Sequence, residues 1–268
     1  MKGWRAVGGA LSIALYVLLW APLVMVAVFS FNASRLGSGW GGFTLEWYAA
    51  LWRNESALAA ARNTAVLAVA STAISTVIGT LLGYGLWMGT RQDGRRSGGW
   101  IWAERSLQVP VLIPDVVFAV ALILWFGWIR QSWSLGEPGM LLMVLGHVSF
   151  QIPFVALVVR ARAARLDPRW VEAARDLGAT PVEAFLKVTL PLLRPGVVAG
   201  ALLALTLSLD DFAVSFFLSG PGSTTLPVLI YAQARRGLTP DIHALSTLLL
   251  VGTVAAVWIG GWWRPRGR

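Results

Sequence analysis

The sequence predicts an all-α fold, a polytopic membrane helical bundle with six transmembrane helices. Of its 268 residues, 56% are hydrophobic and 13% are charged, and the mean hydropathy is +0.66. A soluble domain carries roughly 25% charged residues, so lipid is the solvent that suits this composition. The length suits one compact bundle rather than two large globular domains. The absence of cysteine excludes disulfides, thiol chemistry and Cys-based zinc sites.

Six apolar runs are long enough to cross a bilayer, which takes about 20 helical residues. They are Ala10–Phe31, Asn63–Gly89, Ser106–Ile129, Pro138–Val159, Pro195–Ser219 and Ile242–Trp263. The first run exceeds the core of a cleaved signal peptide, which has roughly 7–15 residues, so we expect it to remain as an anchor. Pro110, Pro114 and Pro153 are expected to kink the third and fourth spans, because proline removes a helical hydrogen bond.

Two pairs of glycines predict close contacts between helices. Gly79 and Gly83 lie one helical turn apart in the second span, and Gly196 and Gly200 do so in the fifth. Small residues at this spacing let two helix backbones approach. The spacing is common in apolar helices, so we assign it to packing alone.

The basic residues are distributed unevenly between the two sides of the predicted membrane. An even number of spans places both termini on one side, and that side holds 16 of the 22 Lys and Arg residues. Cytoplasmic loops carry an excess of these residues, so both termini are predicted to be cytoplasmic. The same distribution accounts for the net charge of +9 without nucleic-acid binding.

Two segments on the opposite side are longer than turns. Residues 32–62 are rich in tryptophan and tyrosine. Residues 220–241 contain the apolar stretch Leu226–Ala232, which is too short to span a bilayer. We expect an interfacial or re-entrant helix at this stretch.

The longest predicted cytoplasmic segment, residues 160–194, has the pattern of two short helices joined by a glycine. Gly178 suits the left-handed residue that ends the first helix. Thr180 and Glu183 have the spacing of a capping box, which starts the second helix. Pro191 is expected to end that helix, because its ring cannot continue the hydrogen-bond ladder.

The first of these two helices is predicted to have an apolar face. Trp170, Ala173, Ala174 and Leu177 follow the i, i+3, i+4, i+7 spacing of one helix face. The two alanines would let a partner surface approach closely. The alternative is that the helix pair packs on its own bundle.

The same segment carries a long motif. Glu172, Ala173 and Ala174 are followed after three residues by Gly178, and after nine more by Val188-Thr189-Leu190-Pro191. This pattern resembles the EAA motif of permeases in binding-protein-dependent ABC importers. The resemblance implies a coupling region that docks on an ATP-binding subunit. The coupling residues that it implies are Glu172, Ala173, Ala174, Gly178, Leu190 and Pro191.

Four further stretches resemble the polyamine permeases of this family, the putrescine permeases first and the spermidine permeases next. They are Ser30–Ser34, Leu207–Phe212, Ser219–Pro227 and Thr239–Leu245. The resemblance implies the ABC type I importer transmembrane fold in a bacterial inner membrane. It also implies a second permease subunit, two ATP-binding subunits that hold ATP and Mg, and a periplasmic polyamine-binding protein. We expect a first span and outer segment over residues 1–57, a permease domain over 58–260 and a cytoplasmic tail over 261–268.

Three acids fall inside the predicted spans: Asp115 in the third, and Asp210 and Asp211 in the fifth. A charge at the middle of a bilayer costs about 2.5–3.5 kcal/mol on insertion scales. The spans contain no Lys or Arg, so these acids are expected to lack a basic partner within them.

A polyamine is a cation with an apolar stem, and carboxylates together with Trp or Tyr faces would attract it. We therefore expect the three acids to line or flank a substrate path. Neighbouring helical residues point about 100° apart, so Asp210 and Asp211 cannot face one point on a regular helix, and one of them is free to bond a neighbouring helix or a broken turn. The alternative for all three is a structural role, either protonated or bonded to the backbone. His147, in the fourth span, is expected to be a satisfied packing residue.

Other functions are disfavoured by what the sequence lacks. No segment matches the phosphate-binding loop G-x-x-x-x-G-K-[ST], so ATP hydrolysis is expected in a separate subunit. Two isolated histidines without cysteine make a metal site improbable, and no catalytic constellation supports a membrane enzyme. The remaining alternatives are an ABC importer permease for another small solute and a secondary cation-coupled transporter.

Overall fold

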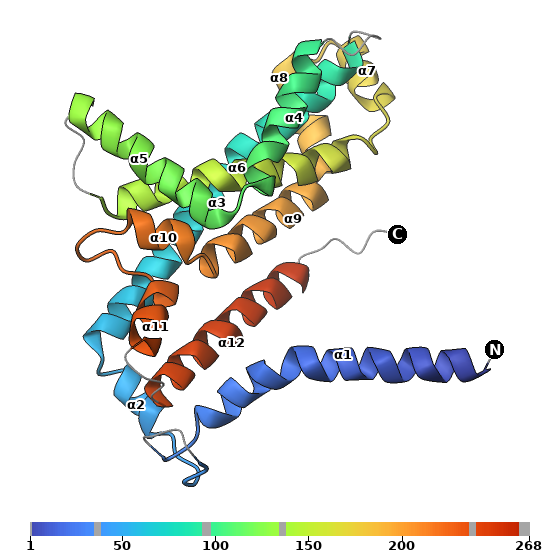
Figure 1. Cartoon of the computed structure of the whole chain (residues 1–268). Coiled ribbons are helices and arrows are strands. Elements are labelled where there is room, and N and C mark those ends of the chain that lie inside the picture. The colour runs from blue at the N-terminus through green and yellow to red at the C-terminus, as the bar shows by residue number, and fades with distance from the viewer. Residues whose placement is uncertain (1, 35–38, 93–97, 134–137, 236–239, 263–268) are drawn as a thin grey trace. The chain divides into compact units, whose positions relative to one another are not determined.

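The computed structural model describes residues 2–34, 39–92, 98–133, 138–235 and 240–262 (Figure 1). Within these residues the regular structure is helical, apart from one isolated antiparallel bridge between Asn32 and Phe43. The predicted all-α class is therefore confirmed. The chain divides into two compact units, Met1–Ala61 with Leu226–Val254 and Arg62–Thr225 with Ala255–Arg268.

The helical elements follow one another closely along the chain. They are α1 (Lys2–Phe29), α2 (Glu46–Leu51), α3 (Glu55–Gln92), α4 (Gly98–Leu112), α5 (Asp115–Trp133), α6 (Met140–Ala163), α7 (Arg169–Asp176), α8 (Pro181–Ala184), the π-helical turn η1 (Phe185–Thr189), α9 (Leu190–Leu209), α10 (Ala213–Leu218), α11 (Leu226–Ala234) and α12 (Pro240–Trp262).

Five helices among the described residues are long and apolar enough to cross a bilayer. They are Gly8–Phe29, Glu55–Gly89, Met140–Ala163, Pro181–Leu209 and Pro240–Ile259. A sixth crossing is obtained if the bent pair of α4 and α5 counts as one span. The predicted end of the last span, Trp263, and the tail beyond it lie outside the described residues.

The third predicted span is broken rather than kinked. Its two parts, Gly99–Leu112 and Asp115–Gln131, meet at an angle of 106°. Pro110 and Pro114 are four residues apart, so the N–H that would bond the carbonyl of Pro110 is missing as well. The prediction of one continuous helix over Ser106–Ile129 is therefore wrong, and Asp115 lies in the first turn of α5 instead of deep inside a helix.

The fifth predicted span differs from the structure at both ends. The helix starts at Pro181, well before the predicted Pro195, and its last residue is Leu209. A non-helical step over Asp210, Asp211 and Phe212 then leads into the short helix α10. The prediction of a helix through to Ser219 is therefore wrong, because the chain breaks at the two acids.

Helix α6 forms the core of the second unit, with α3 and α9 packed against it. A Cβ added at Gly83 of α3 would lie 2.5 Å from the carbonyl oxygen of Ala156, and one at Gly79 would lie 2.7 Å from the Cβ of Val155. A Cβ added at Gly200 of α9 would lie 3.2 Å from a methyl carbon of Val155. The predicted packing role of these glycines is confirmed, since each lets a backbone lie close to α6.

In the first unit, a folded lobe follows α1. The side-chain amide of Asn32 donates to the carbonyl of Gly39 and accepts from the N–H of Gly41, both at 2.7 Å. The indole N–H of Trp47 in α2 donates to the carbonyl oxygen of Asn32 at 2.8 Å. A buried asparagine and an aromatic helix thus hold the predicted tryptophan-rich segment in place.

The apolar stretch predicted after residue 220 is a helix, α11. Leu226 at its start packs with Ala244 and Leu245 of α12 and with Leu51 and Ala57. The predicted short helix is therefore confirmed, and it belongs to the core of the first unit.

Candidate functional site

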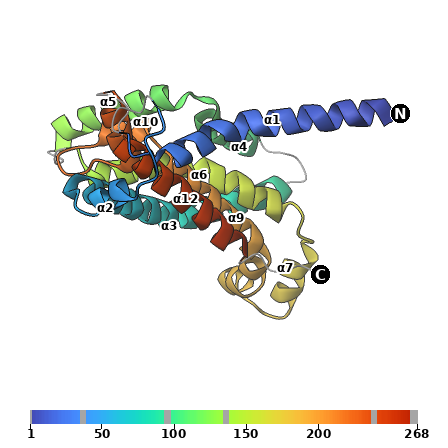
Figure 2. The same cartoon turned by 90° about the horizontal axis from the view of Figure 1, so that it is seen from below.

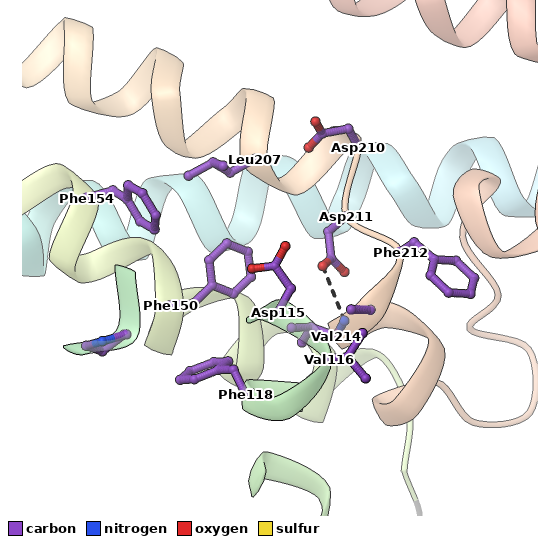
Figure 3. Close-up of a pocket in the computed structure, with 12 residues that line it drawn as sticks. Asp115, Val116, Phe118, Phe150, Phe154, Leu207, Asp210, Asp211, Phe212 and Val214 are labelled. Atoms are coloured by element: carbon purple, nitrogen blue, oxygen red, sulfur yellow. Dashed lines mark hydrogen bonds between the residues drawn. The ribbon is translucent and has the colours of Figure 1, made fainter. Parts of the chain in front are cut away.

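Two helix breaks of the second unit meet at one cavity. The step between α4 and α5 and the step between α9 and α10 adjoin a cavity of about 340 Å³ (Figure 3). Asp115 comes from the first break, and Asp210 and Asp211 come from the second. The structure therefore brings together all three acids that the sequence singled out.

Asp115 and Asp210 are open to the cavity. Asp210 is the capping residue that follows the last residue of α9, and its N–H donates to the carbonyl of Thr206 at 3.3 Å. The carboxylate of Asp115 points from the start of α5 toward the break that carries the other two acids (Figure 3). Both residues are exposed, and neither carboxylate has a hydrogen bond or ion pair with another described residue. These two acids are thus the available anionic groups of the cavity.

Asp211 has a different environment from its neighbour. One carboxylate oxygen accepts from the N–H of Val214 at 3.2 Å, and the other accepts from the N–H of Ser215 at 2.8 Å. The second oxygen also lies 3.2 Å from Nε2 of His147. The side chain is only 9% exposed. Asp211 therefore caps the start of α10, as an acid does at a helix N-terminus.

This environment decides between two expectations from the sequence. The expectation that one acid of the pair bonds a broken turn is confirmed by the two backbone bonds of Asp211. The expectation that the acids lack a basic partner is wrong for Asp211, because His147 of α6 supplies one. His147 is indeed buried and satisfied, as predicted, but it also fixes a residue of the cavity wall.

The rest of the cavity wall is mainly aromatic. Phe118, Phe150, Phe154 and Phe212 line it beside the acids. The rings of Phe118 and Phe150 meet edge to face with centroids 6.4 Å apart. These faces are phenylalanines, where Trp or Tyr was expected, and a phenylalanine face attracts a cation less strongly than a tryptophan face. Carboxylates beside ring faces suit an organic ammonium group.

A second feature lies at the opposite end of α9, where α7 and α8 belong to the segment that the sequence predicts to couple to an ATP-binding subunit (Figure 1 and Figure 2). We call residues 164–194 the coupling elbow after that prediction. Gly178 has φ +86°, the left-handed conformation that was predicted. The predicted capping box is present, since Thr180 and Glu183 each accept from the other's backbone N–H. The carboxylate of Glu183 also accepts from the ammonium group of Lys187, one turn further along, at 3.0 Å.

Pro191 does not end the second elbow helix. The chain stays helical from Pro181 through η1 and α9 to Leu209. The π-helical turn just before Pro191 is wider than an α turn, which leaves room for a ring that would clash with a regular preceding turn. The prediction of a stop at Pro191 is therefore wrong. As a consequence, Leu190 and Pro191 lie on one helix that leads from the elbow to Asp210.

The α7 part of the elbow is exposed in this chain. No residue of α7 is buried, and Trp170 and Leu177 are 62% and 89% exposed. Glu172 and Ala173 are also exposed, whereas Ala174 is half-buried. The alternative that this apolar face packs on its own bundle is thus not supported for Trp170 and Leu177.

The sequence reasoning missed a buried polar network around His147. Gln151 lies one turn further along α6 and is fully buried, as is His147. His147 contacts Ser208 in α9, and Gln151 contacts Ser71 in α3. The signal was present, because His147 and Gln151 are polar residues four apart on one face of an apolar span.

Comparison with known proteins places these features in a family. Residues 81–266 match the family described as "Binding-protein-dependent transport system inner membrane component". The chain is 37% identical over 251 residues to the putrescine transport system permease protein PotI of Escherichia coli K12, covering 92% of this chain and 86% of PotI. It is also 37% identical over 256 residues to the spermidine/putrescine transport system permease protein PotC of the same strain, covering 94% of this chain and 92% of PotC.

Solved structures agree on the fold. A chain of a bacterial ABC transporter involved in alginate import has a TM-score of 0.72 at 18% identity, covering 97% of this chain and 94% of that chain. A chain of the MetNI methionine ABC transporter has a TM-score of 0.66 at 19% identity, covering 82% of this chain and 97% of that chain. The predicted ABC importer transmembrane fold is confirmed. The chain therefore belongs to the inner membrane components of binding-protein-dependent transport systems, as a homologue of polyamine permease subunits.

Proposed function

We propose that this chain is a permease subunit of an ATP-driven importer that moves a polyamine, putrescine or spermidine, across the bacterial inner membrane. One observation carries the proposal. Carboxylates from two separate helix breaks face one phenylalanine-lined cavity, in a chain 37% identical to the putrescine permease PotI.

The chemistry of the cavity suits a polyamine. Each ammonium group of the substrate is attracted by a carboxylate, and the ring faces accept the charged end and the apolar stem. An acid in the membrane without a partner is unfavourable, so a passing dication satisfies Asp115 and Asp210 together. The same charges repel an anionic solute.

The coupling elbow supplies the connection to the energy source. In this proposal, Trp170 and Ala173 of α7 and Leu177 just after it dock on an ATP-binding subunit. Glu172, Ala174 and Gly178 shape the docking helix. Leu190 and Pro191 belong to the continuous helix from Pro181 to Leu209. Movement of the elbow is therefore passed on as rigid-body motion of α9, whose far end carries the break at Asp210.

The complete transporter in this proposal contains further chains. It comprises a second permease subunit, two ATP-binding subunits that hold ATP and Mg, and a periplasmic polyamine-binding protein. This chain spans the membrane with both termini in the cytoplasm, in accordance with its Lys and Arg distribution. If the transporter instead imports another small solute, this architecture stays the same and only the cargo changes. Membership of the binding-protein-dependent family disfavours the other alternative, a stand-alone cation-coupled carrier.

Uptake of radiolabelled putrescine by membrane vesicles that contain the complete transporter tests the proposed cargo. We expect an excess of unlabelled spermidine or putrescine to compete and an equal excess of succinate to have no effect, because the cavity is anionic. Vesicles lacking this chain are the control. Uptake that no polyamine reduces, or no uptake above that control, contradicts the proposal.

A further inference from the structure

A buried polar network beside the cavity is centred on His147. This residue is fully buried in α6, and both of its ring nitrogens contact polar atoms. Nδ1 lies 2.8 Å from the hydroxyl of Ser208, and Nε2 lies 3.2 Å from both the hydroxyl of Ser215 and the carboxylate of Asp211. One imidazole thus joins α6 to the last turn of α9, to the break and to α10.

The contacts continue away from the cavity and hold α3 as well. The Ser208 hydroxyl lies 3.3 Å from that of Ser71. The amide of Gln151 donates to Ser71 at 3.2 Å and to the carbonyl of Ala204 at 3.2 Å, and its oxygen accepts from Ser75 at 2.9 Å. Buried polar groups are costly unless they are hydrogen-bonded, so this satisfied network specifies how α3, α6 and α9 are aligned at the break.

The roles of the ring nitrogens follow from their partners. An ionised carboxylate can only accept, so Nε2 is the nitrogen that donates to Asp211. In the neutral ring, Nδ1 is then the acceptor for the Ser208 hydroxyl. Asp211 in turn accepts from two backbone N–H groups of α10. Its two oxygens are therefore occupied by the protein itself.

Asp115 and Asp210 contrast with Asp211 in the same cavity. Both are exposed and have no hydrogen-bonded or ionic partner elsewhere in the described chain. Two acids adjacent in sequence thus have different environments, one satisfied internally and one open to the cavity.

We propose that the three acids divide their tasks. Asp115 and Asp210 form the cation-binding pair, while Asp211 is a positioning residue that His147 holds in place as the cap of α10, so that the break presents Asp210 to the substrate. This inference rests on the proposed function for the identity of the cation.

The chain offers a matched pair of substitutions for His147. Glutamine reaches as far as Nε2 and can still donate to Asp211, whereas asparagine reaches only as far as Nδ1 and loses that donor. Both remain polar and smaller than histidine. A difference between His147→Gln and His147→Asn therefore reports the bond to Asp211 rather than the loss of the ring.

Two measurements on the same purified complete transporter test the division. The first is equilibrium binding of radiolabelled putrescine in detergent without the binding protein, and the second is ATP-driven uptake after reconstitution. Asp115→Asn and Asp210→Asn should each raise the Kd about tenfold or more, since each removes a charge-assisted contact. Asp211→Asn and His147→Asn should keep the Kd within about threefold of the wild type but lower the uptake rate by about fivefold or more.

Two further variants sharpen the result. His147→Gln should regain at least about half of the wild-type uptake rate, and His147→Asn combined with Asp211→Asn should be no slower than the worse single variant, because both act on one contact. The division is overturned if Asp211→Asn raises the Kd as much as Asp210→Asn does. It is also overturned if the loss of uptake rate in the double variant equals the product of the losses in the two single variants. Wild-type transporter that neither binds nor imports putrescine or spermidine overturns the proposed function itself, whereas wild-type uptake with the wrong pattern among variants overturns only the division.

Discussion

At the scale of single residues, the surroundings decide what an aspartate does. Asp210 and Asp211 are chemically identical neighbours on the wall of one cavity, yet the helix break points their carboxylates in different directions (Figure 3), and only that of Asp211 accepts the N–H groups of α10. A residue that accepts backbone N–H bonds at a helix start stabilises that helix. The stabilisation of α10 by Asp211 therefore depends on its oxygens as hydrogen-bond acceptors more than on its charge.

Substitution of Asp211 separates these two properties. Asp211→Ala removes both acceptors and leaves His147 buried beside an apolar group, so we expect about 1–3 kcal/mol of lost stability. Asp211→Asn keeps one acceptor, and asparagine is among the best capping residues, so the loss should be smaller. Thermal unfolding of the purified chain measures both. Equal melting temperatures for Asp211→Ala and wild type contradict the capping role.

At the scale of elements, glycines set the distances between helices. Gly83 of α3 faces the carbonyl of Ala156 on α6, where an added Cβ would lie 2.5 Å from the oxygen. Gly85, only two residues further on, has nothing within 4 Å of such a Cβ. The two positions in one helix therefore form a matched pair.

We expect Gly83→Ala to destabilise the chain and Gly85→Ala to leave it unchanged or slightly more stable. The first forces α3 away from α6, an overpacking that costs about 1–3 kcal/mol. The second only improves helix propensity, by up to about 1 kcal/mol. Melting temperatures of the two variants in the same detergent give the comparison. A similar loss for both shows that the close approach of α3 and α6 is not what Gly83 provides.

The turn of the coupling elbow gives a second matched pair. Gly178 has φ +86° with open space around it, so a side chain there meets backbone strain but no clash. Gly178→Ala should weaken the elbow by about 1 kcal/mol, whereas Gly178→Asn is tolerated because asparagine adopts this conformation more readily. We expect the amount of ATP-binding subunit that co-purifies with the chain to fall for alanine more than for asparagine. Equal recovery with both variants indicates that the left-handed turn does not matter for docking.

Sequence reasoning succeeded for elements whose cause is local and failed where tertiary contacts decide. The capping box of Thr180 and Glu183 and the left-handed Gly178 depend on a few neighbouring residues, and both are present. Pro110 and Pro114 predict an interruption of the helix near Asp115, but their spacing does not determine the angle of 106° between α4 and α5. The helix continues past Pro191 because a π turn precedes it, and no pattern of proline predicts such a turn.

At the scale of the whole molecule, Asp115 lies 95 residues before Asp210 in the sequence, and only the fold brings it to the same cavity as Asp210 and Asp211. Their presence inside apolar spans predicted a shared role, and the structure supplies the shared location. The partner of Asp211 escaped prediction because His147 lies on another helix. The sequence therefore identifies the acids within apolar spans whose roles need an explanation, and the tertiary structure identifies the groups that contact them.

The central claim is that the elbow couples an ATP-binding subunit to movement of a polyamine through this chain. ATP-dependent uptake of radiolabelled putrescine by proteoliposomes that contain the complete transporter tests it most directly, with Leu177→Asp as the uncoupled variant. Leu177 is 89% exposed, so an acid there should leave the chain folded but disturb docking. We predict that putrescine uptake requires ATP and the ATP-binding subunit. Leu177→Asp should largely abolish this uptake. Putrescine uptake at the full rate by this chain alone, under an ion gradient and without nucleotide, contradicts the account.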